Sequence, residues 1–169
     1  IKLESKGPVL FVQERAGYRT KPFRMLKFRS MYSDLTDPTG AQLTQRSDPR
    51  VTKIGNLLRR TSIDELPQFF NVLKGEMSLV GPRPHPSGAK AGSTLYDDLI
   101  PNFYARYRVK PGITGLAQIS GLRGNTETEQ HLIDRFQADM RYVAEWTPFL
   151  DVYIMIRTVL HVFKGTNAF

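Results

Sequence analysis

The sequence sets two adjacent acidic residues behind a pair of arginines, in the run Arg59-Arg60-Thr61-Ser62-Ile63-Asp64-Glu65-Leu66-Pro67. Ser62 and Glu65 have the spacing of a helix capping box, which predicts that a helix begins here. In that register Asp64 lies in the first turn, where the helix dipole stabilises a carboxylate by about 0.3–1 kcal/mol. Pro67 favours a later start, near Asp64, because proline prefers the first turn of a helix. Both registers place the acidic pair at a helix N-terminus, where backbone N–H groups also suit phosphate.

The segments on both sides of this run have helical spacing. Residues 51–60 repeat apolar side chains at the helical period. A second apolar stripe, at i, i+3, i+4 and i+7, predicts the helix that follows; its members are Leu66, Phe69, Phe70 and Leu73. Gly75 is placed to end that helix as a C-cap. Prolines then exclude regular helix from 79–86.

The N-terminal segment has the pattern of strands. Residues 9–13 and 23–28 are rich in β-branched and aromatic side chains, and the segment 14–22 between them contains Gly17. This arrangement predicts a β-hairpin. The polar segment 33–50, interrupted by proline and glycine, is predicted to be a loop.

The C-terminal half combines loops and helices. Residues 96–107 predict a short helix, and 110–124, with four glycines and a proline, predict an ordered loop with a short strand at 116–119. Apolar periodicity predicts two longer helices, over 127–145 and 149–164.

The helix predicted over 149–164 has an unusually wide apolar face. Its polar side chains fall within an arc of about 140°; they are Asp151, Arg157, Thr158, His161 and Lys164. Two interpretations stay open. The helix either lies in a membrane interface, which suits its aromatic and basic residues, or packs against the core.

Length and composition fit one domain, residues 1–169, with a core of its own. The chain opens on Ile1 without a start signal, which indicates a piece of a longer protein. It has no cysteine, so disulfides and thiolate metal sites are excluded, and no apolar run of 18 residues that would predict a membrane-spanning helix. The net charge of +8 favours anionic partners: nucleic acid, phosphorylated molecules or an acidic membrane surface.

Several basic residues lie on rigid or glycine-bearing segments. Arginines held in this way suit bidentate contacts with phosphate. The candidates are Lys27, Arg29, Arg83, Lys110 and Arg123, together with Arg59, which precedes the acidic pair. Each alone reads as a solvated surface charge; together they predict a polyanion site. Asp64 or Glu65 could hold Mg²⁺ there, between the protein and a diphosphate.

Other site types are not supported. His85, His131 and His161 lack the spacing of zinc ligands. Neither a Walker A loop nor a Gly-x-Gly-x-x-Gly motif is present, which argues against the ordinary nucleotide-binding motifs.

Four blocks carry a resemblance to a known family. They are GPVLFVQERAG at 7–17, KFRSM at 27–31, the block from Arg59 to Pro84, and VKPGITGLAQ at 109–118. In this order they resemble the bacterial sugar transferase family, over residues 1–164. The resemblance implies a mixed α/β fold: a compact, mainly helical, membrane-associated domain with a small β-hairpin or sheet. It also implies that a membrane-entering helix precedes Ile1.

The same resemblance implies an activity. Members of this family are membrane-bound phosphoglycosyl transferases, which move a sugar-1-phosphate from a UDP-sugar to polyprenyl (undecaprenyl) phosphate at the cytoplasmic face of the bacterial inner membrane. The reaction starts surface polysaccharide or glycoconjugate synthesis. It is ping-pong, through a covalent phosphosugar–aspartyl intermediate.

The family's roles carry over to matching residues here. Asp64 would be the nucleophile and Glu65 a Mg²⁺ ligand. Arg59 and Ser62 match positions near the transferred or lipid phosphate. Arg83 matches a Pro-Arg-Pro element, and Arg123 falls where the family places a basic residue near the nucleotide.

Two other functions stay open from composition. The charge suits a nucleic-acid-binding module, but no helix-turn-helix, zinc finger or RNP motif is present, so nucleic acid is not expected as a partner. A catalytically silent membrane scaffold is the other, and the intact acidic pair argues against it. The sugar, the oligomeric state (monomer or homo-oligomer) and the pathway are not specified by the sequence.

Overall fold

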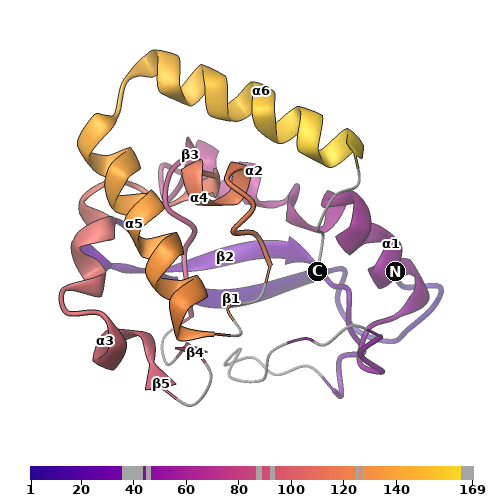
Figure 1. Ribbon diagram of the computed structural model, residues 1–169. Coiled ribbons are helices and arrows are strands. Elements are labelled where there is room, and N and C mark those ends of the chain that lie inside the picture. Colours follow the sequence, from indigo (N-terminus) through magenta and orange to yellow (C-terminus); the bar gives the residue numbers. More distant parts are fainter. Residues whose placement is uncertain are drawn as a thin grey trace.

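The N-terminal part is built on an antiparallel hairpin of β1 (Leu10–Ala16) and β2 (Pro22–Phe28). The computed structural model describes residues 1–35, 44, 47–86, 89–91, 94–124, 126 and 128–164. The strands are joined by the 3₁₀ turn η1 (Tyr18–Thr20), and Gln13 pairs with Met25 at the centre of the ladder. Figure 1 shows the hairpin in the middle of the view. The predicted hairpin is confirmed, although its first strand begins one residue later and ends three residues later than expected. Most of the predicted loop 33–50 lies outside the described residues.

The acidic pair follows a helix instead of starting one. Helix α1 (Lys53–Thr61) ends at Ser62, which has the left-handed φ of 59°. The 3₁₀ turn η2 (Ile63–Glu65) comes next, and α2 (Gln68–Leu73) begins directly after Pro67. The capping box is therefore wrong: Ser62 makes no side-chain cap. The preference of proline for a helix start fixes the beginning of α2 at Pro67. Gly75 follows α2 with φ +77° and donates its N–H to Val72 O (2.9 Å), as predicted for a C-terminal glycine.

Two distant segments form a short parallel pair. β3 (Ser78–Val80) pairs with β6 (Gly112–Thr114) in the register Val80 to Thr114. A Cβ atom on Gly112 would lie 2.1 Å from Gly81 N, so the strands can approach this closely only because Gly112 has no side chain. The strand expected at 116–119 is wrong, because those residues form the short helix α4 (Leu116–Ile119). The backbone groups that pair with β3 come just before it.

The remaining elements are mainly helical. β4 (Lys90–Ala91) and β5 (Thr94–Leu95) form a small antiparallel pair. The short helix expected at 96–107 occurs as two pieces, α3 (Tyr96–Leu99) and the 3₁₀ helix η3 (Phe103–Arg108). Pro101 and the left-handed Asn102 separate them.

The two long helices are close to their predicted ranges. They are α5 (Glu129–Glu145) and α6 (Pro148–Lys164). Thr128 caps α5 by accepting a bond from His131 N (3.2 Å). Figure 1 shows α6 running across one end of the molecule, over α2 and α4.

The buried apolar residues form three separate clusters. The first packs the N-terminal end of α5 against α3 and η3; the second packs α5 and α6 on β3 and α4; the third joins β2 to Met77. Their members are Tyr96, Ile100, Phe103 and Leu132; Val80, Ile119, Tyr142 and Ile154; and Phe23, Met25 and Met77. Polar side chains are buried beside them. Asn71, with no exposed surface, accepts from Leu26 N (3.0 Å) and donates to Arg24 O (2.8 Å), which fixes α2 to β2.

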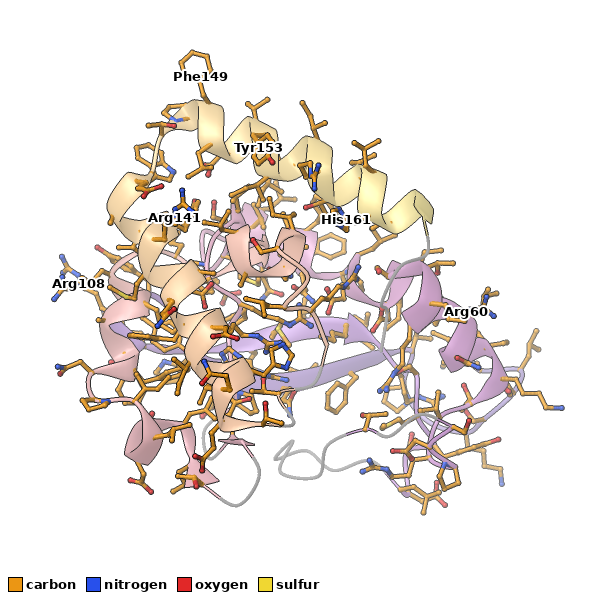
Figure 2. All side chains as sticks on the ribbon, viewed as in Figure 1. Arg60, Arg108, Arg141, Phe149, Tyr153 and His161 are labelled. Carbon is orange, nitrogen blue, oxygen red and sulfur yellow. The ribbon has the colours of Figure 1, made fainter. Side chains whose placement is uncertain are left out.

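Helix α6 both packs on the core and leaves an apolar face in solvent. Ile154 is fully buried, and Thr158 bonds with Thr114 (2.6 Å), so these two side chains point toward the domain. Large apolar side chains on the helix are exposed; they are Phe149, Val152, Tyr153, Ile156, Val159 and Leu160. Figure 2 shows Phe149 projecting from the start of α6 away from the rest of the molecule. The stripe predicted on α2 is also exposed, with Leu73 at 82%. None of the described helices is long and apolar enough to cross a membrane.

Gly55 lets α1 lie directly against the end of the hairpin. A Cβ atom there would lie 2.0 Å from Ser30 O, a backbone atom that also accepts from Thr52 N (3.0 Å). We expect Gly55→Ala to lower the free energy of unfolding by about 2 kcal/mol in urea titration, because overpacking exceeds the helix-propensity gain of about 1 kcal/mol. Asn56→Ala, on the exposed side of α1, is the matched control and should change stability by less than about 0.5 kcal/mol. An equal or greater stability for Gly55→Ala would contradict this packing.

Candidate active site

Glu65 is the centre of the candidate site. Its Oε1 lies 2.9 Å from Lys27 Nζ and 2.5 Å from Arg83 Nη2, and its Oε2 accepts from Arg83 Nη1 at 3.3 Å. Lys27 belongs to β2, Glu65 to η2, and Arg83 follows β3. Three segments far apart in sequence therefore meet at one carboxylate.

Asp64 is turned inward by the geometry of η2. The left-handed Ser62 ends α1 and redirects the chain, after which Glu65 N donates to Ser62 O (3.2 Å) to close the tight turn. Asp64 is only 9% exposed, whereas Ile63 and Leu66 on either side of the pair are 40% and 50% exposed. The turn thus buries the carboxylate of Asp64 and exposes the neighbouring apolar residues, while Glu65 is partly buried.

Two further arginines border the acidic pair. Arg59 donates from Nε to Ser30 Oγ (2.8 Å), and Arg123 donates from Nη2 to Ser62 Oγ (2.5 Å). Each guanidinium also acts electrostatically on Asp64 and Glu65. The structure therefore brings together five of the predicted cationic or hydroxyl residues around the pair; they are Lys27, Arg59, Ser62, Arg83 and Arg123.

The two carboxylates have opposite electrostatic environments. Burial raises the pKa of Asp64 above its usual value, and Lys27 is the strongest of the neighbours that oppose this shift. Burial also acts to raise the pKa of Glu65, but Arg83 and Lys27 hold that pKa well below the ordinary range. Glu65 is thus a permanent anion that neutralises its neighbours, whereas Asp64 is a partly desolvated carboxylate with no ion pair among the described residues.

Two predicted residues are placed elsewhere. Arg29 is buried, and its guanidinium donates to Pro8 O (2.6 Å) and Ser5 O (3.0 Å), so it holds the N-terminal segment. Lys110 is exposed, and its Nζ would lie 3.6 Å from a Cβ atom on Gly75. Neither forms an ion pair with a carboxylate of the acidic pair.

Arg15 is a cationic neighbour of the acidic pair that the sequence patterns did not indicate. Arg15 donates to Pro84 O (3.2 Å) and acts electrostatically on both Arg83 and Glu65. The pKa of Arg15 is lowered to about 10, mainly by burial and secondly by the positive charge of Arg83. Strand alternation could have found it, since Arg15 lies two residues after the buried Gln13 and on the same face of β1.

His85 is the second residue of this region that the sequence patterns did not indicate. Its ring is buried between two guanidiniums, with Nδ1 2.7 Å from Arg106 Nη1 and Nε2 3.5 Å from Arg135 Nη1. Burial, followed by Arg106, holds the pKa of His85 well below its usual value, so the ring is neutral. Its position between prolines gave no signal beyond the Pro-Arg-Pro element itself.

Comparison with known proteins assigns the family. The family model for bacterial sugar transferases matches residues 1–165. The chain belongs to the bacterial sugar transferase family. The predicted resemblance is therefore confirmed, over nearly the whole chain.

Three related proteins are similar to this chain in sequence. An undecaprenyl-phosphate glucose phosphotransferase of Komagataeibacter xylinus is 51% identical over the whole chain, which spans 32% of that protein. A UDP-glucose:undecaprenyl-phosphate glucose-1-phosphate transferase of Escherichia coli K12 is 50% identical, and the chain spans 36% of it. An exopolysaccharide production protein of Rhizobium leguminosarum is 48% identical over 95% of the chain and 80% of its own length.

The arrangement in this sugar transferase domain suits a dianionic ligand. Five cations act on the acidic pair, namely Arg15, Lys27, Arg59, Arg83 and Arg123, against only two carboxylates. An excess of positive charge in a partly desolvated site favours phosphate groups, and arginine binds them through two parallel bonds. The carboxylate oxygens offer the hard ligands that Mg²⁺ prefers.

The opposite environments of the two carboxylates predict opposite effects on stability. Glu65→Gln leaves Lys27 and Arg83 without their shared anion, so we expect urea unfolding at pH 7 to show a loss of about 2–3 kcal/mol. The folded pKa of Glu65 is depressed, so its contribution is present above the unfolded pKa and is lost as pH falls through the folded value. The difference between parent and Glu65→Gln should therefore shrink on acidification.

Asp64→Asn is the matched control for that measurement. The folded pKa of Asp64 is raised, so the ionised side chain disfavours folding at neutral pH, and the neutral amide should increase stability there. This gain should vanish below the unfolded pKa, where Asp64 is protonated in both states. A loss at pH 7 comparable to that of Glu65→Gln would contradict the difference between the two carboxylates.

Proposed function

We propose that this domain transfers a sugar-1-phosphate from a UDP-sugar to a polyprenyl phosphate, through a covalent phosphosugar–aspartyl intermediate on Asp64. The observation that carries the proposal is the buried carboxylate of Asp64, which forms no ion pair with any residue that the structure describes and lies next to Glu65, which the cations neutralise. The names of the relatives support the substrate class, undecaprenyl phosphate and UDP-glucose.

The first half-reaction forms a bond to Asp64. A carboxylate oxygen attacks the phosphorus that carries the sugar, and the phosphoanhydride bond breaks so that UMP leaves with the electron pair. Asp64 needs no general base in this step, because it is ionised when it attacks. Its elevated pKa means that the active form is lost at a higher pH than for an ordinary aspartate as the solution is acidified.

The second half-reaction regenerates the carboxylate. A phosphate oxygen of the polyprenyl phosphate attacks the same phosphorus, and the bond to Asp64 breaks, which releases the polyprenyl diphosphate sugar. Covalent catalysis of this type divides one difficult displacement into two easier ones.

The surrounding cations stabilise the charge that moves in both steps. Arg83 and Lys27 are already held by Glu65, so they are oriented before any ligand binds. Arg59 bonds with Ser30 and Arg123 bonds with Ser62, so both guanidiniums lie close to the acidic pair. There they can bind non-bridging phosphate oxygens or the leaving UMP. Fixed donors of this kind stabilise developing charge without reorganisation.

Asp64 and Glu65 are also the residues that would hold Mg²⁺. Among the described residues no cluster of three or more carboxylate or imidazole groups could hold a metal ion. The adjacent carboxylates offer the one or two protein ligands with which Mg²⁺ is usually bound, and substrate phosphates would complete its coordination. When bound, the ion would neutralise charge on the diphosphate.

The exposed apolar face of α6 supports a membrane surface as the place where the domain acts. We place it at the cytoplasmic face of the inner membrane, where the lipid acceptor would receive the sugar-1-phosphate. Phe149, Ile156 and Leu160 are at least half exposed, and Trp146 is 52% exposed at the start of the helix. Amphipathic helices of this composition bind in the interface, with their apolar side among the acyl chains.

Intact-protein mass spectrometry tests the covalent step. Incubation with Mg²⁺, detergent and a panel of UDP-sugars, without a lipid acceptor, is expected to give an adduct of one phosphosugar. Asp64→Asn should abolish it, because an amide oxygen is not a nucleophile of comparable strength. Asp98→Asn, an exposed carboxylate on α3, is the control and should label like the parent. Labelling of Asp64→Asn within tenfold of the parent would overturn the assignment.

Vesicle binding tests the role of α6. Ile156→Asp removes a side chain worth about 1.5–3 kcal/mol of burial, so partitioning onto phosphatidylglycerol-containing vesicles should weaken tenfold or more. Gln137→Asp, exposed on α5, adds the same charge away from the apolar face and should bind like the parent. Equal loss for both variants would indicate a charge effect and not insertion of α6.

A further inference from the structure

Helix α5 buries two charged side chains on one face. Arg135 is 4% exposed and Asp139, one turn later, is 2% exposed. Buried charges destabilise a fold unless they are fully paired, so their partners identify what they are for. Neither residue is part of the acidic pair or its direct contacts.

Asp139 reaches one side of the site through another arginine. It lies 2.6 Å from Arg106 Nη2, and the same nitrogen donates to Arg83 O (2.7 Å). Arg83 in turn holds Glu65.

Arg135 reaches the opposite side through backbone carbonyls. Its Nε and Nη2 both donate to Leu122 O, at 3.1 and 2.7 Å, and Nη2 donates to Gly124 O at 2.9 Å. These two carbonyls flank Arg123, the residue that bonds with Ser62 next to the acidic pair.

The loop that carries Arg123 depends on such support. Gly121 and Gly124 have left-handed φ values of +85° and +92°, and the segment is neither helix nor strand. Leu122 N has one backbone bond, to Ala117 O (3.1 Å). A guanidinium that clamps two carbonyls therefore sets the direction in which Arg123 leaves the backbone.

We propose that Arg135 is a positioning residue for the transfer reaction: by clamping the carbonyls of Leu122 and Gly124 it aims Arg123 at Ser62 and the phosphate-binding site. This inference rests on the proposed function. It differs from a general role in stability, because the effect of Arg135 on activity must pass through Arg123.

A double-mutant cycle separates the two roles. In the protein with its natural flanking sequence, in membranes, Arg135→Gln should lower kcat/KM by about tenfold to a hundredfold, with the same division between KM for the UDP-sugar and kcat as Arg123→Ala. In the Arg123→Ala background, Arg135→Gln should cost less than about threefold, because the residue that it positions is gone. Arg141→Gln is the matched control: Arg141 is on the same helix, exposed, and paired only with Glu145 (3.0 Å) among the described residues. It should have no effect in either background.

The outcomes are distinct. Equal losses from Arg135→Gln with and without Arg123, or no loss at all, would overturn the proposal. If Arg135→Gln does not fold, Arg135→Lys, which can still donate to one carbonyl, replaces it and must show the same dependence on Arg123. Hydrogen exchange gives a readout independent of activity: the amide of Leu122 and the segment 62–65 should exchange faster in Arg135→Gln than in Arg141→Gln. If the parent forms no phosphosugar adduct, the proposed function fails, and unchanged exchange at these amides would reject the role of Arg135 separately.

Discussion

The shared ion pair of Glu65 with Lys27 and Arg83 is the constraint on which the rest of the site depends. It joins the end of the hairpin, the turn after α1 and the segment after β3. Because Glu65 absorbs these two cations, its neighbour Asp64 is left desolvated and without an ion pair in the described part of the chain. Two consecutive carboxylates thus acquire different chemistry from one tight turn. Glu65 is fixed as an anion by its partners, and burial raises the pKa of Asp64.

The interior behind this ion pair is unusually polar. Arg106, Arg135 and Asp139 occupy space that three small apolar clusters leave unfilled, and each makes bonds to backbone carbonyls or to another charged group. Replacing such groups by apolar residues often stabilises a protein, so their value lies in geometry and not in free energy of folding. Through Arg135, α5 contacts the loop that carries Arg123, and through Asp139 it pairs with Arg106, which bonds with Arg83 O. The helix thus supports two of the arginines beside the acidic pair, while β2 supplies Lys27 directly.

Much of this could be predicted from local patterns. The hairpin, α1, α5 and α6 follow from strand alternation and helical periodicity, and the basic residues on rigid segments pointed to a polyanion site. The failures share a cause, which is tertiary contact. Ser62 has capping-box spacing but ends α1, and the turn that follows brings Glu65 to Lys27 and Arg83. The segment 116–119 looked like a strand, but the backbone groups that pair with β3 belong to 112–114. Arg29 looked like a ligand for phosphate and instead holds Pro8 and Ser5. No spacing rule distinguishes an arginine that binds substrate from one that binds its own backbone.

Helix α6 shows why periodicity alone left two interpretations. A membrane-facing helix and a core helix both present a wide apolar face, and only the partner of the polar residues tells them apart. Here Thr158 bonds with Thr114, and Asp151 accepts from Tyr142 (2.8 Å), so these two polar side chains face the domain, whereas Arg157 is exposed. Ile154 fills the core between them, and the rest of the apolar surface is directed outward. In water, the outward apolar side chains of a helix packed in this way stay exposed to solvent. Under the proposed function, this orientation suits a domain that rests on a lipid surface through α6.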